Sequence, residues 1–227
     1  MPPQPTPARR DVIAQVVQSI VALGPNRLTV AIDGLTAAGK TSFGDEIARC
    51  VAELGRQALR ASLDDFKRPW REAHLYDRTS GEGYYRNAFD YAAVRRLLLE
   101  PAGPQGSGLV ALCSIDPLTQ IDHSAAVVPV SSDGVLIVDG VFAFRPELDG
   151  VWDLKIWLDV DPELSVRRGT RRDVELEGDA NAAEVLHRSR YLPAEMLYLD
   201  EVDPLRAADI VIDNRDFDLP RVLHSAG

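Results

Sequence analysis

A run of eight residues, Gly34-Leu35-Thr36-Ala37-Ala38-Gly39-Lys40-Thr41, matches the pattern G-x-x-x-x-G-K-[ST] without a gap. Its glycines let backbone amides turn inward as a nest for an anion, and the helix predicted after it points its positive dipole end at the same place. Lys40 can reach the β- and γ-phosphates of a nucleotide, and the hydroxyl of Thr41 can ligate Mg²⁺. The sequence therefore predicts a triphosphate site over residues 34–42, including Ser42.

Acidic residues follow two of the predicted strands, where ligands bind in open parallel sheets. Asp139 ends the apolar run "LIVDG", and a carboxylate beside a phosphate-binding loop can hold Mg²⁺ directly or through water. Asp64 and Asp65 follow the run "RQALRASL", where a carboxylate can accept the proton of a substrate hydroxyl. We expect Asp64 to be the base and Asp65 to support it. The alternatives are an ordinary turn aspartate at 139 and a helix cap at 64 or 65.

Four arginines lie within six residues of one predicted helix, in the segment "VRRGTRRD" (166–173). They repel one another unless an anion compensates them, and arginine forks match phosphate oxygens and the charge that develops in phosphoryl transfer. We therefore expect an arginine-rich lid over about residues 165–180. The alternative is a solvated basic face that is offset by Asp173, Glu175 and Glu177.

These candidate residues need a sheet that brings the ends of its strands together. Near-continuous apolar runs predict strands at 27–33, 56–63, 134–141, 154–161 and 208–214. Apolar residues at helical spacing predict helices at 11–24, 40–54, 90–100, 162–178 and 181–202. Strands that alternate with helices indicate a three-layer α/β fold, with helices on both faces of a parallel central sheet.

Two segments fall outside this alternation of strands and helices. We expect both to lie at the part of the site that binds the molecule whose hydroxyl meets Asp64, which we call the acceptor side. One is the polar and aromatic stretch 64–89, and the other is 109–130, in which 109–116 and 125–130 can pair as short strands. The proline-rich residues 1–8 are expected to be a flexible tail with no signal peptide, and 9–227 a single domain.

The composition limits the class of protein. Apolar residues make up 45% of the chain and charged residues 26%, as in soluble globular proteins. The net charge of −10 argues against a nucleic-acid or membrane partner, because both are polyanionic. Cys50 and Cys113 are far apart and are expected to be free thiols, as in a cytoplasmic protein. No apolar run approaches the roughly 18 residues that span a bilayer.

A loop of this kind occurs in switches, motors and kinases. GTPase switches select guanine through Asn-Lys-x-Asp, and none of the three lysines, Lys40, Lys67 and Lys155, lies in that setting. Motor ATPases usually carry extra domains, for which this chain has little room. A kinase needs an acceptor pocket, a base near the hydroxyl and mobile cations, and all three have candidates here. A regulatory nucleotide-binding module with slow hydrolysis stays as an alternative.

In the order of its loop, base and arginines, the chain resembles the uridine kinase family of P-loop NTPase-fold kinases over about residues 29–220. The matching stretches are "GLTAAGKTS", "SLDDF", "NAFDY", "VLIVDGVF", "LDVDPELSVRRGTRRD" and "AADIVIDN". The resemblance implies transfer of the γ-phosphate of ATP or GTP, with Mg²⁺, to the 5′-hydroxyl of uridine or cytidine. It also implies roles for these residues: Asp64 as base, Lys40, Thr41 and Asp139 for nucleotide and metal, and Arg168, Arg171 and Arg172 in the lid.

The acceptor-binding motifs of that family are altered in this chain. Lys67 stands where the family usually has tyrosine. Gly83-Tyr84-Tyr85-Arg86 replaces its Phe-Asp-His-Pro, so that only Glu82 nearby could substitute for the ribose-binding aspartate. The segment "CSIDPLTQIDHS" keeps Asp116, with His123 and Ser124 as further candidates, but lacks the aromatic residues that grip a pyrimidine.

Several acceptors are therefore open. Tyr84, Tyr85 and Phe89 could form a stacking wall for a base, or they could pack in the core. Four arginines of the same segment could suit an acceptor with a carboxylate or phosphate: Arg68, Arg71, Arg78 and Arg86. The alternatives to uridine and cytidine are another nucleoside, a pantothenate-like vitamin precursor or a sugar acid. The expected partners are a nucleotide and a small acceptor, and the resemblance also allows a homo-oligomer.

Overall fold

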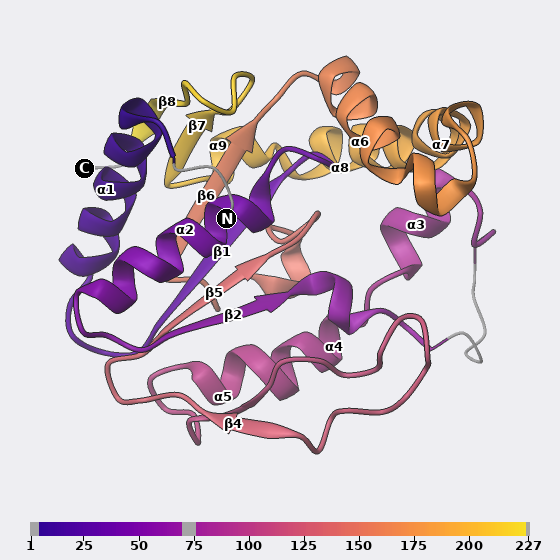
Figure 1. The fold of residues 1–227 in the computed structure, drawn as a ribbon. Helices are drawn as coiled ribbons and strands as arrows, with labels where there is room; N and C mark the ends of the chain where they lie inside the picture. Colours follow the sequence, from indigo (N-terminus) through magenta and orange to yellow (C-terminus); the bar gives the residue numbers. More distant parts are fainter. Residues whose placement is uncertain (1–4, 70–75, 226–227) are drawn as a thin grey trace.

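The computed structural model of the chain describes residues 5–69 and 76–225. Its centre is a six-stranded sheet in the order β2-β5-β1-β6-β7-β8 (Figure 1). The strands are β1 (Leu28–Gly34), β2 (Ala58–Ser62), β5 (Val135–Asp139), β6 (Leu154–Asp159), β7 (Ile210–Asp213) and β8 (Arg221–Ser225). The first five are parallel, as predicted, whereas β8 pairs antiparallel with β7. The sheet is therefore mixed, because the chain turns back at its end to cover an edge.

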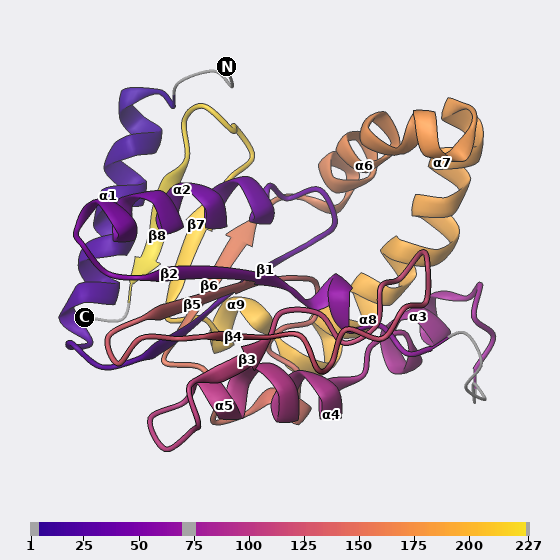
Figure 2. The same cartoon turned by 60° about the horizontal axis from the view of Figure 1, so that its bottom comes forward.

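Helices cover both faces of this sheet and complete three layers. The helices α1 (Pro7–Ala22) and α2 (Lys40–Glu53) lie on one face (Figure 2). The other face carries α4 (Tyr91–Ala93) and α5 (Glu100–Ala102) together with the paired strands β3 (Leu109–Ala111) and β4 (Val127–Pro129), whose pairing was predicted. Further helices are α3 (Gly81–Asn87), α6 (Pro162–Glu177), α7 (Ala180–Leu186), α8 (Leu192–Val202) and α9 (Pro204–Ala207).

The first helix begins earlier than the sequence predicted. Thr6 caps it by accepting a hydrogen bond from the backbone N–H of Arg9, and Pro7 occupies its first turn, where a missing N–H costs nothing. Pro7 and Ala8, assigned to the tail, are therefore helical, while residues 1–4 lie outside the described part of the chain. Arg9 is fully buried and pairs with Glu46 of α2, which fixes the start of α1 against the fold.

Two predicted helices contain a wide turn with π-helical hydrogen bonding, at Val94–Leu99 and His187–Tyr191. In each case a proline follows, Pro101 or Pro193. A proline ring displaces the carbonyl group four residues before it, which here belongs to the wide turn. The helical predictions 90–100 and 181–202 are thus correct in extent, but each is built from a wide turn and shorter α-helices.

The parallel register gathers the polar strand ends at one edge. Ser62 of β2 and Ile32 of β1 both pair with Asp139, the last residue of β5. The strands β1 and β5 are buried along their whole length, so their ends are fixed by the core. Helices α6 and α7 project beyond this edge (Figure 1). Among the described residues, no helix has the length and apolar character needed to cross a membrane.

Candidate functional site

The loop between β1 and α2 has the backbone of an anion nest. Gly39 adopts φ 94° and Ala37 φ 56°, a left-handed conformation that is costly for alanine and that turns the neighbouring amides inward. Lys40 folds back over the loop, and its Nζ donates to the carbonyl oxygens of Gly34 and Leu35 at 2.8 Å each. Burial lowers the pKa of the Lys40 ammonium, although nearby carboxylates oppose this shift.

Three contacts from distant segments hold the loop in place. The Ser165 hydroxyl of α6 donates to the carbonyl oxygen of Thr36 (2.7 Å), and the Glu195 carboxylate of α8 accepts from the Thr36 N–H. The Asn214 amide after β7 donates to the carbonyl oxygen of Ala38 (2.6 Å). Glu195 and Asn214 are both buried. The loop is therefore connected directly to the helices that cover it.

Asp33, the residue before the loop, is a fully buried carboxylate. It accepts hydrogen bonds from the N–H groups of Gly34 (2.6 Å) and Ala143 (2.7 Å) and from the hydroxyl of Tyr198 (2.6 Å). Burial raises the pKa of the Asp33 carboxyl to about 6, even though these donors and Lys40 favour its charged form. Asp33 therefore fixes the loop to the segment after β5 and to α8.

Thr41 and Asp139 meet at the carboxyl edge of the sheet. The Thr41 hydroxyl donates to Oδ2 of Asp139 at 2.7 Å, while the Arg60 guanidinium contacts Oδ1 at 2.6 Å. Arg60 is held by the carbonyl oxygen of Ile137, and Gly44 leaves room for it, because a Cβ there would lie 2.5 Å from the guanidinium carbon. Within the described residues, no group of three or more His, Cys, Asp or Glu side chains could hold a metal.

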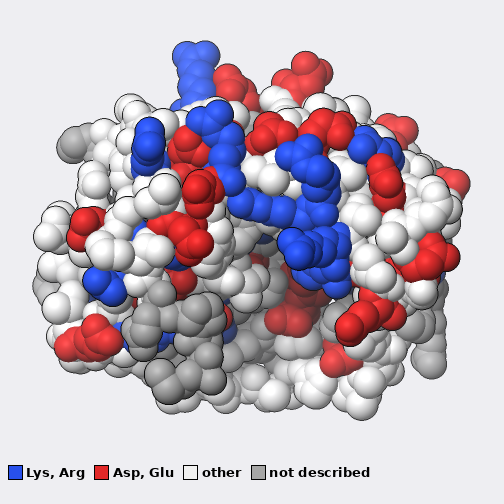
Figure 3. Space-filling model, turned by 45° about the horizontal axis from the view of Figure 1, so that its top comes forward, with Lys and Arg blue, Asp and Glu red and all other residues white. Residues whose placement is uncertain are grey.

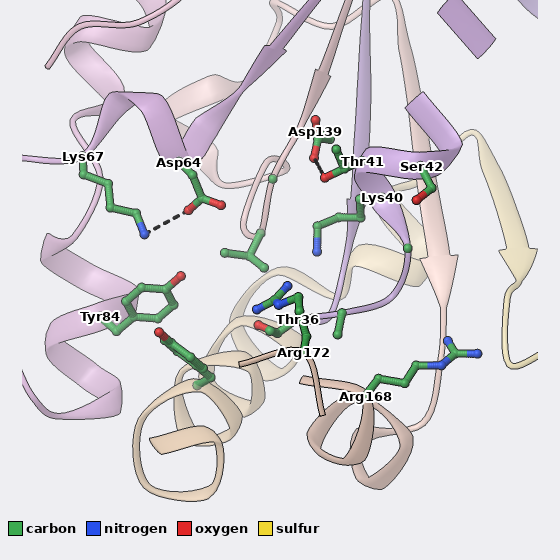
Figure 4. Close-up of a pocket in the computed structure, with 15 residues that line it drawn as sticks. Thr36, Lys40, Thr41, Ser42, Asp64, Lys67, Tyr84, Asp139, Arg168 and Arg172 are labelled. Carbon is green, nitrogen blue, oxygen red and sulfur yellow. Dashed lines mark hydrogen bonds and ion pairs between the residues drawn. The ribbon is translucent and has the colours of Figure 1, made fainter. Parts of the chain in front are cut away.

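Asp64 lies across the cavity from the loop and forms an ion pair with Lys67 (Figure 4). The distance between Lys67 Nζ and Asp64 Oδ1 is 2.9 Å. Partial removal from water would raise the pKa of the Asp64 carboxyl, but Lys67, Lys40 and Arg172 outweigh it and hold that pKa below its ordinary value. Asp64 is therefore ionised and faces the cationic side of the site.

Helix α6 contributes two arginines to the same cavity. Arg168 donates to the carbonyl oxygens of Asn214 and Arg215, at 3.1 and 2.9 Å, and Arg172 pairs with Asp173. Because four residues make about one helical turn, 168 and 172 share a face. Arg171, predicted together with them, is exposed like Arg172 but does not line the cavity.

The back of the lid is fixed by one buried pair. Oδ2 of Asp173 accepts a hydrogen bond from Nε2 of the buried His187 at 2.9 Å, which connects α6 to the wide turn before α8. Gly169 makes this approach possible, since a Cβ there would lie 2.1 Å from the imidazole ring. The segment 165–180, for which a lid was predicted, therefore belongs to a hairpin of α6 and α7. The Asp173–His187 hydrogen bond anchors this hairpin to the segment before α8.

These groups enclose one cavity of about 440 Å³. Its lining comprises Thr36, Ala37, Gly39, Lys40, Thr41, Ser42, Asp64, Lys67, Tyr84, Asp139, Gly140, Val141, Arg168, Arg172 and Tyr191. Figure 3 shows Lys and Arg side chains gathered beside a hollow on this face, although the net charge of the chain is −10. The arrangement can hold phosphate groups on one side and a hydroxyl compound on the other.

The structure places only part of the predicted acceptor set at the cavity. Tyr84 lines it and directs its hydroxyl inward (Figure 4). Tyr85 and Phe89 pack against Phe142 in the core, which excludes them from a stacking wall. Glu82 does not line the cavity and pairs with Arg86.

The second predicted acceptor segment also lies away from the cavity. Asp116 accepts from the N–H groups of Leu118 and Thr119 and stabilises its own turn, and His123 is exposed. Asp65 holds Ser114 through its backbone carbonyl and does not line the cavity. Of the four arginines considered for an anionic acceptor, Arg71 lies outside the described residues. The other three, Arg68, Arg78 and Arg86, do not line the cavity.

Besides Gly140 and Val141, three residues with polar side chains at the site were not among the predicted site residues. Lys67 was noted only as a departure from a motif, yet it faces Asp64, and the rarity of lysine in this chain was a usable signal. Arg60 could have been found as a charge inside a predicted buried strand. Tyr191 gave no signal, because only the wide turn His187–Tyr191 before α8 brings it to the cavity.

The chain is similar in sequence to curated proteins that include two described below, whereas no protein-family model matches it. The uridine kinase of Leuconostoc citreum (strain KM20) is 26% identical over 163 residues, which are 69% of this chain and 73% of that protein. Uridine-cytidine kinase A of Dictyostelium discoideum is 25% identical over 190 residues, which are 82% of this chain and 36% of that protein.

Solved structures share the fold over nearly the whole chain. A possible uridine kinase from Bacillus stearothermophilus superimposes with a TM-score of 0.68 at 24% identity, covering 89% of this chain and 97% of that one. D-glycerate 3-kinase from Cryptococcus neoformans var. grubii gives a TM-score of 0.55 at 12% identity, covering 93% and 99%. The fold is thus that of P-loop kinases, and the resemblance to uridine kinase-like members is confirmed.

Proposed function

We propose that this kinase transfers the γ-phosphoryl group of ATP, with Mg²⁺, to a hydroxyl group of a small molecule. One observation carries the proposal: Asp64 faces Lys40 and the Thr41–Asp139 pair within a single cavity. A protein that only senses a nucleotide does not need a carboxylate opposite the phosphate-binding lysine. GTP is the alternative donor.

On the nucleotide side, Lys40 exchanges the carbonyl oxygens of Gly34 and Leu35 for the β- and γ-phosphates, which are better acceptors of a charged donor. The backbone amides of residues 34–42 bind the remaining phosphate oxygens. Thr41 and Asp139 fit a magnesium site, because Mg²⁺ takes few protein oxygens and completes its shell with water and phosphates. Mg²⁺ held there would neutralise charge on the transferring phosphates.

On the acceptor side, Asp64 orients the hydroxyl and accepts its proton as the acceptor oxygen attacks the γ-phosphorus. Its lowered pKa keeps it ionised at neutral pH, so it is ready to accept. Arg168 now contacts the carbonyl oxygen of Asn214, and Arg172 contacts Asp173. Both side chains can leave these partners, move to the phosphoryl group and stabilise its charge. We assign them the lid role and leave Arg171 out of it.

Uridine and cytidine are the first acceptors to test, since the relatives in sequence carry those names. The alternatives are another nucleoside, a pantothenate-like precursor or a sugar acid. The cavity supports the reaction class more strongly than the nucleosides, because Asp116 and His123 do not reach it.

A screen of ADP release with ATP and Mg²⁺ tests the proposal. The set contains uridine, cytidine, purine nucleosides, pantothenate and D-glycerate, each beside a sample without acceptor. We expect ADP release that depends on one class of acceptor and disappears in Asp64→Asn. Equal ATP turnover with and without every acceptor would favour the regulatory NTPase instead.

A further inference from the structure

Lys67 is held rigidly at the acceptor end of the cavity. Its backbone forms an antiparallel bridge with Phe89, and the next residue, Arg68, donates its N–H to the carbonyl oxygen of Ala88 at 2.9 Å. Its ammonium lies 5.4 Å from the ring centre of Tyr84 and 5.2 Å from that of Phe89. Two aromatic rings therefore attract this cation whether or not Asp64 is engaged.

An acceptor that reaches Asp64 must also approach Lys67. A hydroxyl donates to a carboxylate over about 2.6–3.2 Å, and the Asp64 oxygen lies 2.9 Å from Lys67 Nζ. The reacting hydroxyl and the atoms bonded to it therefore come within contact range of the ammonium. Lys67 is the cation of the described cavity lining that pairs directly with Asp64, whereas Lys40, Arg168 and Arg172 extend from the loop and from α6.

The charge balance changes during the transfer step. The acceptor oxygen forms a bond to the γ-phosphorus, and the bond from that phosphorus to the β–γ bridging oxygen breaks, so that ADP leaves. The hydroxyl proton goes to Asp64. Asp64 then becomes neutral, and Lys67, whose side chain is only 31% exposed, loses its counter-charge. A second anion beside the hydroxyl would keep the ammonium paired throughout.

We propose that Lys67 selects the acceptor, and that the acceptor class is a small hydroxy acid whose carboxylate lies a few bonds from the reacting hydroxyl. This inference rests on the proposed phosphotransfer and narrows it. The carboxylate binds Lys67, the hydroxyl is delivered to Asp64, and Tyr84, which directs its hydroxyl into the same cavity, can contribute a hydrogen bond (Figure 4).

Matched pairs of compounds test the proposal without requiring turnover. Binding of D-glycerate against glycerol, and of pantothenate against pantothenol, is measured by calorimetry on protein saturated with a non-hydrolysable ATP analogue and Mg²⁺. In the wild type we expect one acid to bind about 10-fold or more tightly than its neutral partner, as for one charge-assisted hydrogen bond. Lys67→Met should remove this preference, Lys67→Arg should keep part of it, and Lys155→Met, outside the cavity, should leave it unchanged.

Other outcomes separate this inference from the proposed function. Equal affinity for acid and neutral partner in the wild type, or no binding by either acid, overturns the role of Lys67. A preference that survives in Lys67→Met does the same. If neutral uridine is bound and phosphorylated and Lys67→Met does not change its affinity, the phosphotransfer stands and the hydroxy-acid class is rejected. If an acid binds but no ADP forms when ATP replaces the analogue, the proposed transfer to that acid is rejected.

Discussion

The two sides of the cavity are built in different ways. The nucleotide side comes from one continuous loop whose backbone is fixed by Ser165, Glu195 and Asn214. The acceptor side comes from short stretches far apart in the chain, and its charged groups, Asp64 and Lys67, contact each other. The nucleotide side is a fixed loop of backbone amides, whereas the properties of the acceptor side depend on single side chains. Chemistry is therefore constrained at the loop, and specificity can change at the acceptor side by one substitution.

The largest effect is expected from the centre of the nucleotide side. Lys40→Met removes the ammonium that binds the β- and γ-phosphates, so transfer should fall by about 10³-fold and ATP affinity should drop as well. Calorimetric titration with ATP and Mg²⁺ measures the affinity, and ADP release the rate. The matched control is Lys155→Met, away from the cavity. A Lys40 variant that still binds and transfers normally would remove the loop from the mechanism.

A change on the acceptor side should affect the rate alone. Asp64→Asn keeps the shape of the side chain but cannot accept the proton, so kcat should fall by about 10²-fold or more. ATP binding should remain near normal, because Asp64 does not contact the loop. Measuring both quantities on one preparation separates the two sides. Unchanged kcat would assign the base to another group.

The lid gives a comparison between neighbouring arginines. Arg172→Gln should lower kcat by about 10²-fold, since its guanidinium lines the cavity and can reach the transferring phosphoryl group. Arg171→Gln serves as the control, because Arg171 belongs to the same helix but does not line the cavity. Steady-state kinetics of both variants decide the assignment. Equal losses would mean that the basic character of the helix matters and the position of each arginine does not.

The smallest effect is a shift in pH dependence. Lys67 holds the pKa of the Asp64 carboxyl below its ordinary value, so Lys67→Met should raise that pKa. Protonation of Asp64 then begins at higher pH, so the acidic limb of the pH profile of kcat/KM should shift to higher pH. The alkaline limb should stay in place. An acidic limb at the same pH in wild type and variant would show that another group controls it.

The difference between the two sides also explains how far the sequence could predict the site. The loop directly follows the apolar strand β1, and Asp139 is the last residue of the apolar strand β5. Their positions could therefore be deduced from the neighbouring residues in the sequence. Tyr85 and Phe89 could not be separated from Tyr84 in the sequence, because all three rings pack against Phe142 and only the folded structure shows which of them also lines the cavity. Asp116 and His123 were aligned by motif, but their loop folds on its own turns.

The pattern of apolar residues was sufficient to predict the strands that are buried on both faces of the sheet. It did not predict the edge strand β8. The strand β8 has exposed or half-buried residues along its length, so no apolar run indicated it. The wide turns before Pro101 and Pro193 depend on local hydrogen bonding that apolar spacing does not record. In the lid, helical spacing alone could have separated Arg171 from Arg168 and Arg172.

The central claim is that the γ-phosphoryl group is transferred and not simply released. Phosphorus NMR of a reaction with ATP, Mg²⁺ and a mixture of uridine, cytidine, pantothenate and D-glycerate follows that group directly. We expect a new phosphate-ester signal that grows in step with ADP, with little inorganic phosphate, and that grows about 10²-fold or more slowly in Asp64→Asn. Inorganic phosphate as the only product, formed at the same rate without any acceptor, would contradict it.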